Sequence, residues 1–294
     1  MLIHSILLLI ILHLTFCSEI PRPSEFNDIT FASDDPKGIK SQENLLRTNL
    51  RVINGFPATL GQFPHAIFLL MKSDTNKNYG CGGSLVKLNW ILTAAHCLKN
   101  KMYGFAYAGV VDIFRGPYGS AEKIELDQMY PHPKFMTSNP NFQYDIGLIK
   151  LLEKFPETLN IGTIDLPCNC PEHYNINGVE ITATGFGSTD VKTPGVSPLK
   201  YISMTVMEQT VCQKYFEIQI QDSMLCSNTS LGMTTCLGDS GSGLIANIQN
   251  HKVLVGVVSF GNVYCSAGSS FPSVSSKVSS YLDWIHETFD SNSA

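Results

Sequence analysis

From about residue 52 onward, short runs of hydrophobic residues alternate with clusters of glycine, proline, asparagine and serine. Runs of this length are typical of β-strands, and the polar clusters between them are typical of turns. Many short strands joined by turns indicate an all-β sandwich or barrel. The clearest predicted strands are Ala66–Met71, Trp90–Thr93, Ile146–Leu151, Val179–Thr184, Tyr201–Val206 and Val253–Val258.

The end of the chain has a different hydrophobic spacing. Apolar residues recur there at helical intervals, which places them on one face of a helix. This pattern predicts a C-terminal helix that docks on the barrel. The residues that carry it are Val278, Tyr281, Leu282, Trp284, Ile285 and Phe289.

Residues 1–17 are almost continuously apolar. The stretch is shorter than the roughly 18 residues that a membrane-spanning helix needs. Thr15 and Cys17 are small enough for the positions that a signal peptidase recognises. We expect a signal peptide that is cleaved after Cys17 and a secreted chain with no stable membrane anchor; an apolar anchor is the alternative.

Residues 18–51 form a polar region without cysteine and with several proline and aspartate residues. The region lacks the hydrophobic periodicity of a packed element. It ends at Arg51, and the hydrophobic Val52 follows. A polar segment that ends in a basic residue fits a processing site. The alternative is an unstructured extension without a role.

Composition limits what the remainder can be. The chain has 294 residues, of which 44% are hydrophobic, and this suits one large or two smaller domains. A formal charge of −5 gives no reason to expect nucleic acid as a partner. Loss of Cys17 from the 9 cysteines leaves an even set, which can pair completely in an oxidising compartment.

Three short motifs carry candidate chemistry. Ser240 lies in a Gly-Asp-Ser-Gly motif, and His96 and Asp145 lie upstream in motifs of their own. A serine hydroxyl is a poor nucleophile unless a base lies within hydrogen-bond reach and a further group orients that base. His96 suits the base, because imidazole titrates near neutral pH, and Asp145 suits the orienting group. The backbone amides of Gly238 and Ser240 suit an oxyanion hole.

Each motif also has a plain structural alternative. The Gly-Asp-Ser-Gly stretch fits an ordinary turn, His96 a buried core histidine, and Asp145 a cap before a strand. Zinc is not expected, because Cys81 and Cys97 are not a close ligand pair and secreted cysteines are more often bridged. Calcium is not expected, because the stretch 109–122 has few acidic side chains. In the order His, Asp, Ser, the motifs together indicate a hydrolase that needs no cofactor.

Six motifs follow one another along the chain. These are Val52-Ile53-Asn54-Gly55, Cys81-Gly82-Gly83-Ser84-Leu85, Trp90–Cys97, Asp145–Leu151, Gly238-Asp239-Ser240-Gly241 and Ser259-Phe260-Gly261. In these motifs and their order, the chain from Val52 to about Phe289 resembles the trypsin/chymotrypsin-like serine proteases. The resemblance implies two six-stranded antiparallel β-barrels with the active site between them and a C-terminal helix, in a protease domain of residues 52–294.

The resemblance implies roles for individual residues. His96 would be the general base, Asp145 its orienting partner and Ser240 the nucleophile. The amides of Gly238 and Ser240 would form the oxyanion hole. Ser259 would support Asp145 and help to bind the substrate backbone.

Members of the family are made as zymogens, which would make residues 18–51 an activation propeptide. Cleavage after Arg51 would free the Val52 amino group to pair with Asp239, and a buried ion pair of this kind can order a bistable site. The expected partners are protein or peptide substrates, a trypsin-like activating protease and serine protease inhibitors.

Matching cysteine positions imply three disulfides, namely Cys81–Cys97, Cys212–Cys226 and Cys236–Cys265. Cys168 and Cys170 match no family pair. We favour a bond between these two cysteines, and the alternative is that one of them pairs between molecules.

In the family, the residue six positions before the nucleophile lies at the floor of the primary specificity pocket, and here it is Thr234. A buried cationic side chain would find no carboxylate there, so we expect little trypsin-like cleavage. Gly261 and Ser273 match the pocket walls, and the Ser273 hydroxymethyl group narrows the pocket. The resemblance implies a chymotrypsin-like preference for Leu, Met, Phe or Tyr at the P1 position, with a smaller, elastase-like preference as the alternative.

Asn228 begins an Asn-Thr-Ser sequon, which predicts a glycan in a secreted chain; an unused sequon is the alternative. The leading hypothesis for the whole chain is a secreted serine endopeptidase. A catalytically silent homologue that binds a partner is the alternative. Such homologues usually lack one of the three catalytic residues, and this chain keeps all of them.

Overall fold

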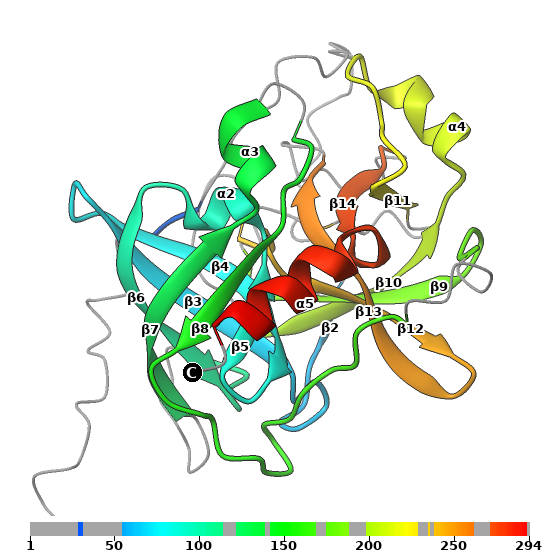
Figure 1. The fold of residues 1–294 in the computed structure, drawn as a ribbon. Coiled ribbons are helices and arrows are strands. Elements are labelled where there is room, and N and C mark those ends of the chain that lie inside the picture. Colours follow the sequence, from blue (N-terminus) through cyan, green and yellow to red (C-terminus); the bar gives the residue numbers. More distant parts are fainter. Residues whose placement is uncertain are drawn as a thin grey trace, which may run out of the picture.

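The computed structural model describes residues 29–31, 55–113, 122–138, 142–168, 175–187, 198–228, 235, 238–261 and 271–292. Strands dominate these ranges, and they form two sheets (Figure 1). The predicted signal peptide and the predicted processing site at Arg51 lie outside the described residues.

The first sheet closes into a barrel. Its strands follow the order β4-β3-β6-β7-β8-β5, and β5 pairs back with β4. All of these pairs are antiparallel. The strands are β3 (Ala66–Ser73), β4 (Asn78–Lys87), β5 (Trp90–Thr93), β6 (Lys101–Ala108), β7 (Glu122–Pro131) and β8 (Gly147–Leu151).

The second sheet closes in the same way from the later part of the chain. Its order is β11-β14-β13-β12-β9-β10, and β10 pairs antiparallel with β11. The predicted pair of six-stranded antiparallel barrels is therefore confirmed. The strands are β9 (Glu180–Gly185), β10 (Lys200–Val206), β11 (Met224–Asn228), β12 (Gly243–Ile248), β13 (His251–Phe260) and β14 (Ser273–Lys277).

Each sheet carries one further strand outside its closed barrel. β2 (Phe56–Pro57) pairs antiparallel with β10. β1 (Ile29–Phe31), the short blue segment in Figure 1, pairs parallel with the first residues of β4. Residues 18–51 lack the hydrophobic period of a packed element, yet β1 lies among them and its Ile29 is buried. A strand this short, paired through its backbone, shows no hydrophobic period in the sequence.

Some strands are longer than the predicted hydrophobic runs, because polar residues at their ends also form hydrogen bonds with the neighbouring strand. β5 has the predicted bounds, whereas β13 extends the run Val253–Val258 at both ends. His251 and Lys252 are exposed but still pair with β12. Apolar runs mark the buried part of a strand, and the hydrogen-bonded part is longer.

The predicted C-terminal helix is present (red in Figure 1). A 3-10 turn, η4 (Val278–Tyr281), leads into α5 (Leu282–Ser291). Ile285 and Phe289 belong to the core of the first barrel, where the Phe289 ring lies 5.1 Å from the Trp90 ring. The other described helices are too short to show a helical period: α2 (Ala95–Leu98), α3 (Pro133–Ser138), α4 (Gln209–Cys212) and η3 (Gln213–Tyr215).

An apolar cluster joins the two barrels. Phe68 and Tyr107 of the first barrel share it with Phe186 and Leu199, which flank the connection from β9 to β10. A backbone hydrogen bond crosses at the same place, since Leu199 N–H donates to the carbonyl of Val111, which follows β6, at 2.6 Å. The junction therefore has fixed geometry, and it brings residues of both halves of the chain side by side.

Candidate active site

His96 lies on the single turn of α2, immediately after β5, and its side chain is buried. Two bonds tie it to Asp145. Its backbone N–H donates to Asp145 Oδ1 at 2.9 Å, and its Nδ1 lies 2.7 Å from Asp145 Oδ2. Both carboxylate oxygens are thus used to fix the position and the ring orientation of one histidine.

Asp145 lies two residues before the start of β8 and is fully buried. Ser259 Oγ, from β13, donates to Asp145 Oδ2. Ser276 Oγ, from β14, donates to the Asp145 backbone carbonyl at 2.6 Å. Because both serines belong to the second barrel, a carboxylate of the first barrel is held from both sides of the junction.

The electrostatics of the pair favour an ionised aspartate. Burial alone would raise the pKa of Asp145, but the charge of His96 and hydrogen bonds from His96 and Ser259 outweigh it, so the pKa lies below its usual value. An ionised carboxylate accepts a hydrogen bond from Nδ1–H. The neutral imidazole ring therefore carries its proton on Nδ1 and its lone pair on Nε2. That tautomer is the one a general base needs.

Ser240 lies in the turn that leads into β12, on the second barrel. Gly238 and Gly241 adopt φ values of +95° and +82°, a region that favours glycine. A Cβ on Gly241 would lie 2.5 Å from the Gly82 carbonyl oxygen, so this backbone approach also requires glycine. Gly82 N–H donates in turn to the Ser240 carbonyl at 2.8 Å, which anchors the turn to the first barrel.

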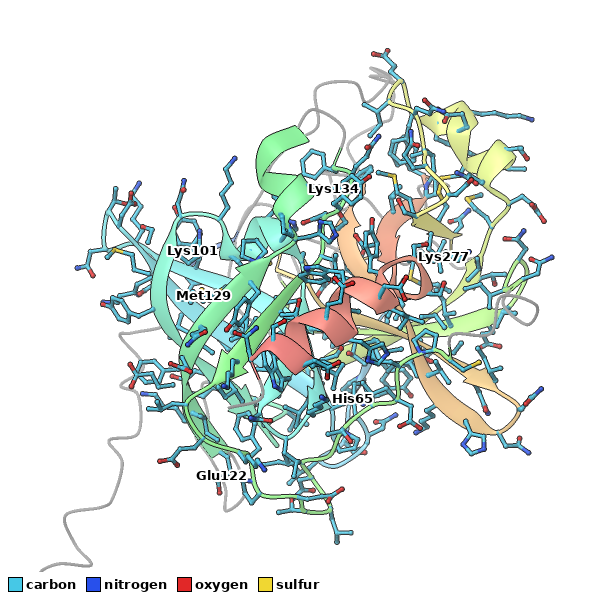
Figure 2. All side chains as sticks on the ribbon, in the orientation of Figure 1. His65, Lys101, Glu122, Met129, Lys134 and Lys277 are labelled. Atoms are coloured by element: carbon cyan, nitrogen blue, oxygen red, sulfur yellow. A yellow bond between two sulfur atoms is a disulfide. The ribbon has the colours of Figure 1, made fainter. Side chains whose placement is uncertain are left out.

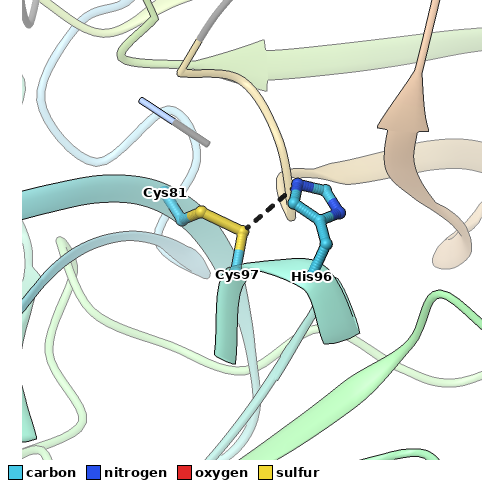
Figure 3. A group of neighbouring side chains, drawn as sticks. All are labelled: Cys81, His96 and Cys97. Atoms are coloured by element: carbon cyan, nitrogen blue, oxygen red, sulfur yellow. Dashed lines mark hydrogen bonds between the residues drawn. A yellow bond between two sulfur atoms is a disulfide. The ribbon is translucent and has the colours of Figure 1, made fainter. Parts of the chain in front are cut away.

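The Cys81–Cys97 disulfide lies beside His96 (Figure 3) and beside the backbone of Ser240. The Cys97 sulfur lies 3.8 Å from His96 Nε2 and 3.7 Å from the Ser240 carbonyl oxygen. With the Nδ1 proton directed at Asp145, the approach of Nε2 to the sulfur is a van der Waals contact rather than a hydrogen bond. The structure therefore brings the Ser240 backbone carbonyl and Nε2 of His96 to the same sulfur atom.

Cys81, His96 and Cys97 have the proximity of a metal site, since their candidate ligand atoms lie within 4.8 Å of one another. Their chemistry does not fit one. The two sulfurs are bonded to each other, so neither is a thiolate, and a single imidazole remains. The cluster is a brace for the histidine loop.

Comparison with known proteins decides the family. The family model described as Trypsin matches residues 52–285. This chain belongs to the trypsin family. Members of the family are serine proteases, which hydrolyse peptide bonds, and the match begins at Val52, directly after the predicted processing site.

Individual relatives and a solved structure agree with this assignment. The chain is 32% identical to Serine protease 1 of Drosophila melanogaster, over 81% of the chain and 85% of that protein. It is 32% identical to a collagenase of Hypoderma lineatum, over 81% of the chain and 86% of the relative. A solved structure described as HL collagenase has a TM-score of 0.71 and 32% identity, covering 81% of this chain and 99% of that one.

Asp239 occupies a well-defined niche of this trypsin-family chain. Its Oδ1 accepts a hydrogen bond from Gly187 N–H at 3.0 Å. A Cβ on Gly185 would overlap the same oxygen, so the niche exists because residue 185 has no side chain. Arg51 and Val52, its predicted partners in activation, lie outside the described residues.

The predicted pocket residues are partly described. Thr234 lies outside the described residues, whereas a Cβ on Gly261 would lie 3.4 Å from Ser273 Oγ. Thr235, which sequence reasoning missed, lies with its Oγ1 2.9 Å from Ser273 Oγ. Its position beside Thr234 was the only sequence signal. The described members of this group, Thr235, Gly261 and Ser273, carry no ionisable side chain.

The remaining predicted sites lie on the second half of the chain. A disulfide joins Cys212 to Cys226 and ties α4 to β11. Cys168 is exposed, while Cys170, Cys236 and Cys265 lie outside the described residues. Asn228 ends β11 and is partly exposed, and the rest of its sequon lies outside those residues as well. None of the described helices has the length and hydropathy that crossing a membrane requires.

Proposed function

We propose that this trypsin-family chain is a secreted serine endopeptidase that works through an acyl-enzyme. In this proposal residues 1–17 are the signal peptide, 18–51 the activation propeptide and 52–294 the protease domain. The observation that carries the proposal is the pair of hydrogen bonds between Asp145 and His96 on the first barrel, with the Ser240 turn of the second barrel bonded to Gly82 of β4. A buried histidine held by both oxygens of an ionised carboxylate is poised as a base.

The catalytic cycle follows from that geometry. His96 Nε2 takes the Ser240 hydroxyl proton as the oxygen attacks the peptide carbonyl, and Asp145 stabilises the resulting imidazolium. The amides of Gly238 and Ser240 stabilise the negative oxygen of the tetrahedral intermediate. His96 then protonates the departing amine, and water repeats the sequence to release the acyl group.

Activation would use the niche of Asp239. Cleavage after Arg51 by a trypsin-like protease frees the Val52 amino group. An ion pair between this amino group and Asp239 would fix the adjacent turn at Ser240. Support comes from the position of Asp239, whose carboxylate already lies against Gly185 and Gly187. A buried cation beside a carboxylate offsets the desolvation cost that either group alone would bear.

The pocket group supports cleavage after an uncharged P1 residue. Gly261 has no side chain to obstruct a P1 residue, and the Thr235 and Ser273 hydroxyls near it are uncharged. Thr234, which the resemblance assigns to the pocket floor, has no carboxylate. An arginine or lysine side chain would be desolvated there without a partner, which is costly. We expect Leu, Met, Phe or Tyr at P1, with smaller residues as the second preference.

Cleavage-site profiling tests this function. Residues 18–294 are activated with trypsin, the trypsin is removed, and a mixed peptide library is digested. The account predicts cleavage after Leu, Phe, Tyr or Met that is lost in Ser240→Ala and kept in the control Ser203→Ala, whose serine is partly exposed on β10. Cleavage after Arg or Lys would contradict the pocket assignment, and no cleavage by a chain that starts at Val52 would contradict the enzymatic function.

A further inference from the structure

The N-terminal strand β1 lies on an edge that leads to the candidate nucleophile. β4 pairs with β3 along one edge from Asn78 to Ser84. On the opposite edge β1 pairs with Asn78–Gly80, and β5 pairs with Ser84–Lys87. Between those two strands, Gly82 N–H on the same edge donates to the Ser240 carbonyl.

This order places β1 directly beside the active site. Phe31 is paired with Gly80, which is two residues from Gly82, or about 7 Å along a strand. Cys81, between them, carries the disulfide that contacts His96 (Figure 3). An unpaired strand edge is the natural partner of an extended peptide, because it offers both donors and acceptors. β1 therefore takes the backbone edge that an extended substrate would otherwise find next to Ser240.

The strand is anchored at its other end. Ile29 is buried in the cluster that joins the barrels, together with Phe68 and Phe186. A cation lies near the middle of the edge that receives β1, where Lys101 of β6 (labelled in Figure 2) holds its ammonium group 3.6 Å from the centre of the Tyr79 ring. The stretch 24–36 that contains β1 is acidic and has no Lys or Arg, so its charge complements that of Lys101.

We propose that Ile29–Phe31 is an internal inhibitor strand, which covers the substrate edge of β4 until the N-terminal segment leaves. The inference rests on the proposed peptidase function of the same site. Residues 18–51 contain no cysteine, so no disulfide holds the segment once the chain is cut after Arg51. Its described residues are held by backbone pairing with β4 and by the burial of Ile29. Once the covalent tether is lost, so short a strand loses its high effective concentration and can dissociate. In this proposal the edge of β4 becomes accessible to substrate when residues 18–51 dissociate, and cleavage after Arg51 alone does not expose it.

A peptide of residues 24–36 tests the proposal directly. Binding is measured by fluorescence anisotropy on trypsin-cleaved, gel-filtered Ser240→Ala chain, which makes this arm independent of activity. We expect saturable binding that Ile29→Asp in the peptide weakens by roughly tenfold or more, because a buried aliphatic contact is lost. No binding, or equal binding by a scrambled peptide of the same composition, overturns the proposal.

Competition with substrate tests whether the strand covers the site. On cleaved wild-type chain, peptide 24–36 should inhibit hydrolysis of a long peptide that extends on both sides of the cleaved bond, and should leave a single-residue ester unaffected. Equal inhibition of both substrates, or of neither, overturns the proposal even if the peptide binds. If the cleaved chain hydrolyses neither substrate, the proposed function fails, and the anisotropy arm alone decides whether the strand docks.

Discussion

Asp145 shows how much of this molecule depends on single hydrogen bonds. The carboxylate has no exposure to solvent, and its partners come from α2 and β13, while Ser276 of β14 donates to the Asp145 backbone carbonyl. A buried charge is tolerated only where it is paired and fully hydrogen-bonded. Removing one partner at a time should therefore separate the residues that tune the histidine from those that merely hold the chain.

Asp145→Asn should abolish most of the activity while the fold is kept. The amide NH2 would donate to His96 Nδ1, which moves the ring proton to Nε2 and removes the lone pair that faces the serine. We expect kcat to fall by roughly ten-thousand-fold with little change in KM. Steady-state kinetics check this, with the exposed Asp222→Asn as the control. A loss below tenfold would count against the proposed role of Asp145.

Ser275 and Ser276 form a matched pair for stability. Both side chains are buried, but Ser276 Oγ donates to the Asp145 carbonyl, whereas Ser275 Oγ has no hydrogen-bond partner in the described part of the chain. Ser276→Ala should lower the free energy of unfolding by about 1–3 kcal/mol, because it leaves a buried carbonyl unpaired. Ser275→Ala should be neutral or stabilising. Urea unfolding of both variants measures the difference, and equal losses would contradict it.

At the scale of elements, the turn before β12 is the most constrained segment of the site. Its backbone is hydrogen-bonded to Gly82 of β4, and its glycines Gly238 and Gly241 both have positive φ. These contacts leave little room for another backbone conformation. The glycines permit this conformation, and the position of Ser240 depends on it.

Gly241→Ala should be far more damaging than Gly178→Ala. Both glycines have positive φ, +82° and +75°, so both substitutions carry the same kind of backbone strain. Only Gly241 is crowded: an added Cβ would overlap Thr93 Oγ1 and lie 2.5 Å from the Gly82 carbonyl oxygen, whereas at Gly178 it would meet nothing within 4 Å. We expect Gly178→Ala to cost about 1 kcal/mol and Gly241→Ala clearly more. Thermal unfolding of both variants decides, and equal shifts in Tm would show that the close approach has no energetic weight.

At the scale of the whole molecule, one buried histidine couples stability to pH. His65 (labelled in Figure 2) is the residue before β3, and its Nε2 has no hydrogen-bond partner among the described residues. Burial, with a smaller contribution from the charge of Lys252, lowers the pKa of His65 to about 4. Below pH 6.5 the unfolded chain binds a proton at this position and the folded chain does not, so stability falls as the pH drops from 6.5 towards 4.

His65→Phe should reduce the acid sensitivity of the fold. The full effect of a pKa lowered from 6.5 to about 4 is about 3 kcal/mol of unfolding free energy between those pH values. In the variant, the unfolding free energy should therefore fall less steeply from about pH 7 to about pH 4 than in the wild type. His251→Phe, at an exposed position, is the control and should keep the wild-type slope. An unchanged slope in His65→Phe would contradict the assignment.

The sequence predicted the elements with a regular hydrophobic pattern and the motifs that resemble those of the family. Alternating apolar runs marked the barrel strands, and Val278 to Phe289 marked the last helix, because burial on one face leaves a period in the sequence. Ser276, Thr235 and Ile29 left no such mark. Ser276 acts on a residue 131 positions away, Thr235 through a neighbouring hydroxyl, and Ile29 in a strand of 3 residues. Contacts between distant segments depend on how the two barrels meet, and no local pattern records that.

Stoichiometric labelling is the measurement that tests the central claim most directly. Chain cut after Arg51 is treated with a serine-directed organophosphonate, and the adduct is located by mass spectrometry. The account predicts one adduct per chain, on Ser240, with labelling lost in His96→Ala and much slower in the uncut chain. Absence of an adduct on Ser240 in folded chain that begins at Val52 would contradict the claim that His96 and Asp145 activate this serine.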